Sequence, residues 1–203
     1  MKYYIADIHF GHEKIIEYEN RPFRTVEEMD EEYIRRWNAK VKPGDDVYIL
    51  GDFSFHKGEE TNRILLRLNG KKFLIQGNHD NMYLCDKDFR HSLFMWERDY
   101  YISRDGGDHV ILFHYPIQTW FNQHRDTLHF YGHVHSNSGT FHPMKYEIPN
   151  SYNVCIDVIG EPMTKDEILE FYRKKGKEEW KQLVRSARIA VIGIAGNKWV
   201  RCL

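Results

Sequence analysis

The stretch that decides the fold is KFLIQGNHD, residues 72–80. A short apolar run, typical of a buried strand, gives way directly to glycine, asparagine, histidine and aspartate. In an open α/β sheet, ligands bind beyond the carboxyl ends of the strands, where loops converge on a rigid scaffold. We therefore expect Asn78, His79 and Asp80 to lie in a functional loop at the end of a strand over 72–76.

The same pattern, in which an apolar strand stops at a potential metal ligand, recurs four more times along the chain. The segments are KYYIADIH (2–9), VYILGD (47–52), VILFH (110–114) and LHFYGHVH (128–135). Because the carboxyl ends of neighbouring strands meet at one edge of a sheet, we expect these polar ends to form a single site. Its members are Asp7, His9, Asp52, Asn78, His79, His114, His133 and His135.

Helical patterns separate several of these strands, which indicates an α/β architecture. Thr25 and Glu28 have the spacing of a capping box, and the apolar residues that follow predict an amphipathic helix over 26–39. A second helix is expected to end at the turn Asn69-Gly70.

We expect hairpins and loops in two segments, 82–108 and 136–158, with a last core strand over 153–158. The chain contains no internal repeat and no linker rich in glycine, serine or proline. It is therefore predicted to be a single domain, 1–203, with a core over 1–160.

The C-terminal extension, 161–203, has its own helical signals. A capping box at Thr164 and Glu167 opens one helix, and a second helix of mixed charge is expected over 178–188. Docking on the core and a homodimer contact are both open functions for this extension.

The charge balance excludes bulk electrostatic capture of polyanions. Lys and Arg number 29 against 30 Asp and Glu, giving a formal charge of −1, so we expect no long nucleic acid as a partner. Hydrophobic residues make up 41% of the chain, which argues against disorder.

The cysteines and the apolar runs indicate a cytoplasmic protein. Cys85, Cys155 and Cys202 match neither a disulfide framework nor a zinc-thiolate spacing, as expected in a reducing compartment. Charged and polar residues interrupt the N-terminus, so we expect no signal peptide there. The longest apolar stretch, IAVIGIAG (189–196), is far shorter than the roughly 20 residues that span a bilayer, so no membrane partner is expected.

Histidine is the most unusual feature of the composition, with 12 in 203 residues, and imidazole is the commonest metal ligand. Asp-x-His and His-x-His each place two ligands on the same side of an extended segment. The five segments supply more donors than one ion can use, whereas two divalent ions that share a carboxylate can use them all. Nitrogen and oxygen donors without a thiolate favour Mn, Fe, Co, Ni or Zn.

The ordered set of motifs resembles the calcineurin-like metallophosphoesterase superfamily, and in particular its compact bacterial and phage-type members. The resemblance covers residues 7–135 and rests on D-x-H (Asp7, His9), G-D (Asp52), G-N-H-D (Asn78, His79, Asp80), a lone His114 and G-H-x-H (His133, His135). It implies a four-layer α/β sandwich of two mixed sheets flanked by helices.

The resemblance also implies a role for each residue. Asp7, His9 and His135 hold a first metal, Asp52 bridges, and Asn78, His114 and His133 complete a second site. His79 faces the substrate as a catalytic residue, and Asp80 orients it. Two divalent ions, with Mn²⁺ the first choice, activate a bridging hydroxide for in-line attack on phosphorus.

The expected reaction is hydrolysis of a small phosphodiester or phosphomonoester, with nucleotides a reasonable class. The segment GDFSFHKG (51–58) lacks the Asp-Arg pair of phosphoprotein phosphatases, which disfavours a phosphoprotein substrate. The alternative is a protein-binding scaffold of the same fold, as in a retromer subunit that has lost catalytic residues. Arg21 is left open between phosphate binding and a surface ion pair, and His12 and His56 between a substrate-facing and a structural role.

Overall fold

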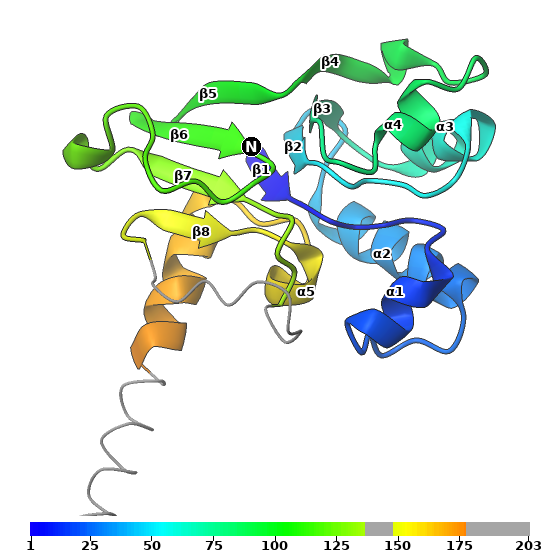
Figure 1. Ribbon diagram of the computed structural model, residues 1–203, viewed down its shortest axis with the longest axis horizontal. Helices are drawn as coiled ribbons and strands as arrows, with labels where there is room; N and C mark the ends of the chain where they lie inside the picture. Colours follow the sequence, from blue (N-terminus) through cyan, green and yellow to red (C-terminus); the bar gives the residue numbers. More distant parts are fainter. Residues whose placement is uncertain (137–147, 178–203) are drawn as a thin grey trace, which may run out of the picture. The chain divides into compact units, whose positions relative to one another are not determined.

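The computed structural model describes residues 1–136 and 148–177 (Figure 1). The chain divides into two compact units, Met1–Ile168 and Leu169–Leu203. Of the second unit, residues 169–177 are described, and they are helical. The helix expected over 178–188 and the apolar segment after it lie outside the described residues.

The described part of the first unit contains two four-stranded sheets. The first sheet is parallel throughout and has the order β1 (Lys2–Ile5), β2 (Asp46–Leu50), β3 (Lys71–Ile75), β4 (Phe94–Arg98). The second has the order β5 (Tyr100–Asp105), β6 (Asp108–Phe113), β7 (Leu128–Tyr131), β8 (Ser151–Asn153). It is mixed, because β5 and β6 form an antiparallel hairpin whereas the other pairs are parallel.

The α-helices labelled in Figure 1 are α1 (Glu13–Tyr18), α2 (Val26–Lys40), α3 (Gly58–Arg67), α4 (Asn81–Leu84) and α5 (Ile156–Ile159). Short 3₁₀ turns occur at His91–Leu93 and Gln123–Arg125. The structure thus confirms the predicted α/β class with two sheets and flanking helices, although the first sheet is parallel rather than mixed. No helix in the described ranges has the length and apolarity needed to cross a membrane.

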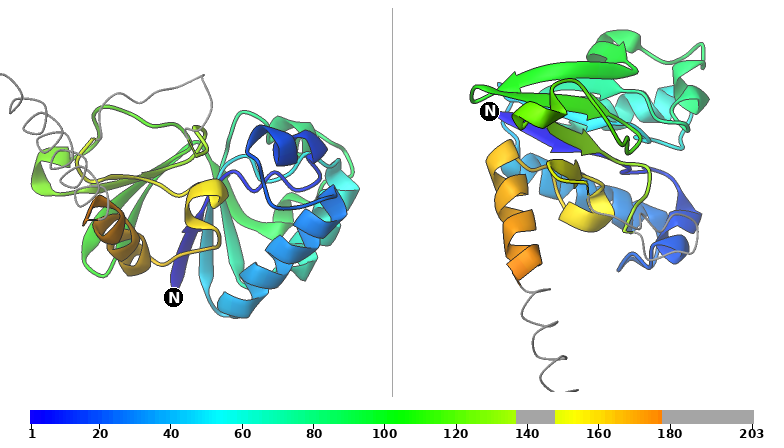
Figure 2. Two further views of the ribbon diagram at one scale, coloured as in Figure 1. Left: turned by 90° about the horizontal axis from the view of Figure 1, so that it is seen from below. Right: turned by 60° about the vertical axis from the view of Figure 1, so that its left-hand side comes forward.

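One face of the first sheet packs against α2 and α3 (Figure 2). Strand residues such as Ile5 and Ile49 meet Trp37 of α2 and Leu65 of α3 in one buried cluster. The α2 helix begins where predicted, because the Thr25 side chain accepts a hydrogen bond from the Glu28 amide. Burial of the apolar faces of α2 and α3 holds these two helices as a layer on the first sheet.

The other face of the first sheet carries aromatic side chains that meet the second sheet. Tyr4, Tyr48 and Phe73 lie side by side in register across three strands. The ring of Tyr4 contacts Phe130 of β7 at 4.9 Å between centroids, and Tyr48 stacks near Tyr101 of β5. These aromatic contacts join the two sheets face to face.

The register of the parallel strands brings the candidate loops together. Ile5 pairs with Ile49, and Leu50 pairs with Ile75, so β1, β2 and β3 end at one edge of the sheet. Backbone bonds continue the pairing beyond the strands, because the Asp7 amide donates to the Gly51 carbonyl at 3.0 Å. The loops after these strands are therefore held in contact.

Two segments differ from the sequence expectations. The loop region 82–108 contains β4, which extends the parallel sheet, in addition to the expected hairpin. The strand predicted over 153–158 is wrong: β8 ends at Asn153 and α5 begins at Ile156. The Asn153 side chain accepts a hydrogen bond from the Cys155 amide, and Cys155 forms an isolated parallel bridge with Ala6 before the helix begins.

Candidate metal centre

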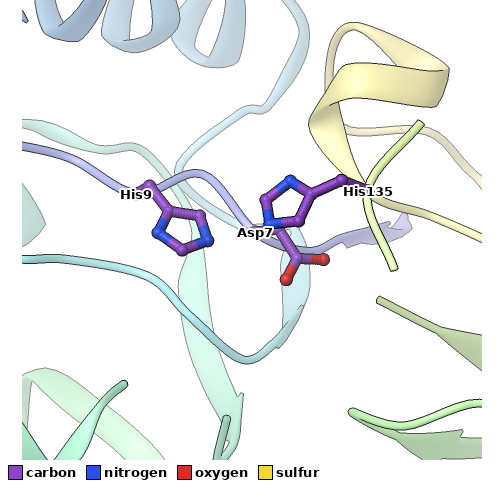
Figure 3. A group of neighbouring side chains, drawn as sticks. All are labelled: Asp7, His9 and His135. Carbon is purple, nitrogen blue, oxygen red and sulfur yellow. The ribbon is translucent and has the colours of Figure 1, made fainter. Parts of the chain in front are cut away.

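Asp7, His9 and His135 form the first group of potential ligands (Figure 3). Asp7 and His9 follow β1, whereas His135 comes from the loop after β7, more than 120 residues away in the sequence. One potential ligand atom from each side chain lies within 4.8 Å of the others. Figure 3 shows the three side chains gathered around a common space. The group is close enough to hold one ion.

The Asp7 carboxylate is fully buried and has few compensating donors. Its two oxygens accept hydrogen bonds from the His133 amide at 3.0 and 2.9 Å. A Cβ at Gly132 would collide with the carboxylate, so the glycine of the G-H-x-H motif permits this close approach. Burial, reinforced by the charge of Asp52, raises the pKa of Asp7 to about 8, although the charge of the His135 ring acts to lower it.

His9 is a buried histidine whose ring nitrogens lack hydrogen-bond partners among the described residues. Its side chain is 3% exposed. Burial holds the pKa of His9 well below its ordinary value, so the ring is neutral. A buried imidazole normally pairs its nitrogens, because an unpaired buried polar atom costs free energy. A bound cation would accept the lone pair of the unprotonated His9 nitrogen.

Asp52 lies between the first group and a second one. Its Oδ2 is 3.7 Å from His9 Nε2 and 3.7 Å from His114 Nε2. Its Oδ1 accepts a hydrogen bond from the His79 amide at 2.9 Å, and burial raises its pKa. A Cβ at Gly77 would collide with this carboxylate, which explains the glycine before Asn78. One carboxylate is thus within reach of both groups.

The second group contains Asn78, His114 and His133. The Asn78 Oδ1 lies 3.0 Å from His114 Nε2 and 3.0 Å from His133 Nδ1. Nδ1 of His114 faces the Leu50 carbonyl at 2.8 Å, and a carbonyl can only accept, so His114 carries its proton there. Burial lowers the pKa of His114, which leaves Nε2 with a lone pair. The structure brings these three predicted site residues together.

The backbone of the site is conformationally strained. Five of the predicted ligands have a positive φ between 46° and 70°, a region that costs energy for residues other than glycine. They are Asp7, His9, Asp52, His133 and His135. Such strain concentrates at functional sites, where it aims side chains that a relaxed loop would direct elsewhere.

His79 stands at the rim of the site. Its side chain is 45% exposed, and its Nε2 lies 4.0 Å from Asp52 Oδ2. It contacts the rings of His9 and Phe55. It is therefore accessible from solvent while adjoining both groups of ligands, as the predicted substrate-facing position requires.

Asp80 has other partners than the predicted one. Its carboxylate accepts hydrogen bonds from the amides of Asp52, Phe53 and Gly77 at 2.8–3.0 Å, and from the Tyr83 hydroxyl. Among the described contacts none joins it to the His79 ring. Asp80 holds the backbones of two ligand loops together, and we assign it that role instead of the orientation of His79.

Sequence reasoning missed Asp157 and misjudged Arg21. The Asp157 Oδ2 lies 2.8 Å from His135 Nδ1, and its oxygens also accept from the Arg21 guanidinium. Burial alone would raise the pKa of Asp157, but His135 and Arg21 outweigh it and hold that pKa below its usual value. Arg21 is buried, so neither a surface ion pair nor a phosphate contact describes it. No local motif marks either residue.

His12 and His56 have structural contacts. The His12 ring stacks on Phe55 at 3.9 Å between centroids, and His56 Nε2 lies 3.3 Å from Asp30. Asp30 also accepts from the Gly11 amide, which ties down the turn after His9. These contacts support the loop that carries the first two candidate ligands.

The donor set fits divalent cations. Two carboxylates with raised pKa values lie beside the neutral His9 imidazole, whose nitrogens have no hydrogen-bond partner among the described residues, and the other candidate ligands offer nitrogen and oxygen donors. Such a buried cluster is costly by itself and becomes favourable when cations neutralise it. The residues could therefore hold metal ions.

Comparisons with known proteins find two relatives and one solved structure that are similar to this chain over most of its length. A protein of Methanocaldococcus jannaschii, MJ1445, is 34% identical over 180 residues, covering 85% of this chain and 91% of that relative. The gene 66 protein of Mycobacterium phage L5 is 27% identical over 207 aligned positions, covering 87% and 96%. A crystal structure of AQ665, a protein of unknown function from Aquifex aeolicus, superposes with a TM-score of 0.65 at 27% identity. It covers 84% of this chain and 98% of its own.

No family model matches the chain. The likeness to the archaeal relative extends over nearly the whole length of both proteins, at an identity that reflects common descent. The chain therefore belongs to the same family as MJ1445 of Methanocaldococcus jannaschii.

Proposed function

We propose that the protein is a dinuclear metal-dependent phosphoesterase of the calcineurin-like metallophosphoesterase superfamily. One observation carries the proposal: Asp52 Oδ2 lies 3.7 Å from a histidine nitrogen of each ligand group. A carboxylate within reach of both groups is the arrangement that two neighbouring cations require.

Each group would hold one ion, with Asp52 between them. Asp7, His9 and His135 would bind the first, and Asn78, His114 and His133 the second. When bound, two divalent ions supply Lewis acidity and an activated water for attack on phosphorus. Mn²⁺ is our first choice among Mn, Fe, Co, Ni and Zn, the metals that a set of nitrogen and oxygen donors without a thiolate favours.

The protein's own residues bind and orient the substrate. The exposed ring of His79 can donate a hydrogen bond to a phosphoryl oxygen or a proton to the leaving alkoxide. The Asp80 carboxylate keeps the His79 loop next to the Asp52 loop through its bonds to the Gly77 and Asp52 amides. The substrate we propose is a small phosphodiester or phosphomonoester, such as a nucleotide.

The test is hydrolysis of bis-p-nitrophenyl phosphate by the protein loaded with Mn²⁺. Asp52→Asn keeps the oxygen that accepts from the His79 amide, and His79→Ala removes an exposed ring, so both variants should fold. We expect each to lower turnover at least about 100-fold, as the loss of key electrostatic groups does elsewhere. His91→Ala is the matched control, because this exposed ring pairs with Glu97 away from the site.

Full activity in both site variants would refute the proposal. Absence of hydrolysis by a wild-type protein that binds two ions would favour the scaffold alternative. The same assay over monoesters, diesters and cyclic nucleotides would identify the preferred substrate class.

A further inference from the structure

A buried ion pair lies directly behind the first group of ligands. Arg21 Nε donates to Asp157 Oδ1 at 2.7 Å, and Arg21 Nη2 donates to Asp157 Oδ2 at 2.9 Å. The two side chains are 2% and 5% exposed. A buried pair of this kind is weak evidence for stability, because desolvation offsets much of the attraction. Its position therefore calls for another explanation.

The remaining donors of Arg21 reach the loop that carries Asp7 and His9. Its Nη1 donates to the Ile8 carbonyl at 2.8 Å, and its Nη2 donates to the Asp7 carbonyl at 3.0 Å. Both Asp7 and His9 have a positive φ. The guanidinium therefore holds two consecutive carbonyls of a strained loop in place.

The Asp157 carboxylate reaches the third ligand of the group. Its Oδ2 lies 2.8 Å from His135 Nδ1, and an ionised carboxylate can only accept, so the ring proton resides on Nδ1. A ring held in this way binds an ion through the lone pair of its other nitrogen, Nε2. A carboxylate partner of this kind fixes both the tautomer and the direction of a metal-binding imidazole.

We propose that Arg21 and Asp157 are positioning residues that preset Asp7, His9 and His135 for one metal ion. The inference rests on the proposed metal centre. One side of the ion pair orients the D-x-H loop through its carbonyls, and the other side sets the tautomer of His135. The two ligand loops, far apart in the sequence, are thereby joined through a single buried contact.

Both oxygens of Asp157 are needed. Oδ1 accepts from Arg21 Nε, while Oδ2 accepts from Arg21 Nη2 and from His135 Nδ1. In Asp157→Asn the amide group must replace one oxygen. If it faces Nε, two donors oppose each other. If it takes the place of Oδ2, it offers a proton to His135 Nδ1 and favours the tautomer protonated on Nε2, which cannot bind the ion.

Cys155 offers a competing interpretation of the same residues. His135, Cys155 and Asp157 also have potential ligand atoms within 4.8 Å of one another. In that arrangement the ion would compete with an Arg21 donor for the Asp157 oxygen that it used, because each oxygen already accepts from Arg21. We therefore assign Asp157 to ligand orientation and not to direct binding, and Cys155→Ser separates the two arrangements.

The experiment measures binding of Mn²⁺ to the chelator-treated full chain by isothermal titration calorimetry. Asp157→Asn should lower the affinity for one of the two ions by about 10–100-fold, as loss of such partners does elsewhere. The affinity for the other ion should be unchanged. Asp45→Asn is the matched control, because Asp45 is also a buried, paired carboxylate, bonded to the N-terminus and the Lys42 amide. Cys155→Ser should bind both ions like the wild type.

A second readout is the tautomer of His135, from ¹⁵N-histidine NMR spectra of the metal-free protein. The wild type should carry its proton on Nδ1, which a merely structural role for Asp157 would not require. Should Asp157→Asn leave Arg21 unpaired and fail to fold, the double variant Arg21→Met/Asp157→Asn removes both buried charges. This double variant should show the same loss of affinity for one ion.

The outcomes separate this inference from the proposed function. Two ions bound with equal affinity by wild type and Asp157→Asn, or a His135 proton on Nε2, would overturn the positioning role alone. Loss of an ion in Cys155→Ser would also overturn it, in favour of direct binding by the thiol. A wild-type protein that binds no Mn²⁺ would overturn both proposals.

Discussion

Replacing Asp7 with asparagine should stabilise the metal-free protein while abolishing binding of one ion. The substitution is isosteric, and asparagine tolerates the positive φ of this position. An amide oxygen can still accept the hydrogen bond from the His133 amide. The main change is the removal of a carboxyl group whose charged form the unloaded site does not compensate.

The size of the effect follows from the pKa. Burial raises the pKa of Asp7 from 3.8 to about 8, and each unit corresponds to 1.36 kcal/mol. At pH 7 the unfolded carboxyl is ionised while the folded one is protonated, so the carboxyl costs the folded protein up to about 4 kcal/mol. Because water entering the metal-free site reduces this cost, we expect a gain of about 1–3 kcal/mol in the variant.

The sign of the pH dependence is fixed by the same shift. A folded pKa above the unfolded one means that the cost of Asp7 is absent below about pH 4 and grows as the pH rises toward 8. The advantage of Asp7→Asn should therefore be small at pH 5 and larger at pH 8. Urea unfolding of the chelator-treated proteins at the two pH values measures it.

Metal should reverse the order of stability. Saturating Mn²⁺ stabilises the wild type by mass action, whereas the variant gains only from the ion that it still binds. Asp45→Asn is the control in which the substitution should lower stability instead of raising it, since the N-terminal ammonium and the Lys42 amide lower the pKa of Asp45. A metal-free Asp7→Asn protein less stable than the wild type, or an equal Mn²⁺ effect in both, would refute the reasoning.

Two further predictions concern residues around the site and in the second sheet. Gly132→Ala should displace the Asp7 carboxylate and lower the free energy of unfolding by about 1–3 kcal/mol through overpacking. The variant should also bind Mn²⁺ more weakly in calorimetry, and an unchanged affinity would contradict this prediction. Burial lowers the pKa of His129 from 6.5 to about 4, so stability should fall by about 2 kcal/mol between pH 7 and 5 through this residue. His129→Phe should lose that part of the pH dependence in urea unfolding, and an unaltered pH profile would count against it.

The strand-end rule identified most of the candidate site from sequence. Asp7, Asp52 and Asn78 each follow a parallel strand, so the register of the sheet brings the loops that carry them together. His114 and His133 follow strands of the second sheet, and the same rule applies to them. The grouping was predictable because it depends on topology and on short motifs.

The supporting residues were not predictable in the same way. Arg21 lies in the loop before α2, and Asp157 lies in α5, a helix that sequence analysis expected to be part of a strand. Their pairing joins positions 136 residues apart with no periodic pattern to mark it. Asp80 was read as part of its motif, whereas its bonds to the Asp52 and Phe53 amides depend on the fold of two loops.

The central claim is most directly tested by anomalous scattering from crystals grown with saturating Mn²⁺. The account predicts two peaks per chain, one on each side of Asp52 Oδ2 and separated by roughly 3.5–4 Å. One peak should touch His135 and the other His114. A single ion, or none, with these histidines directed away from each other would contradict the account.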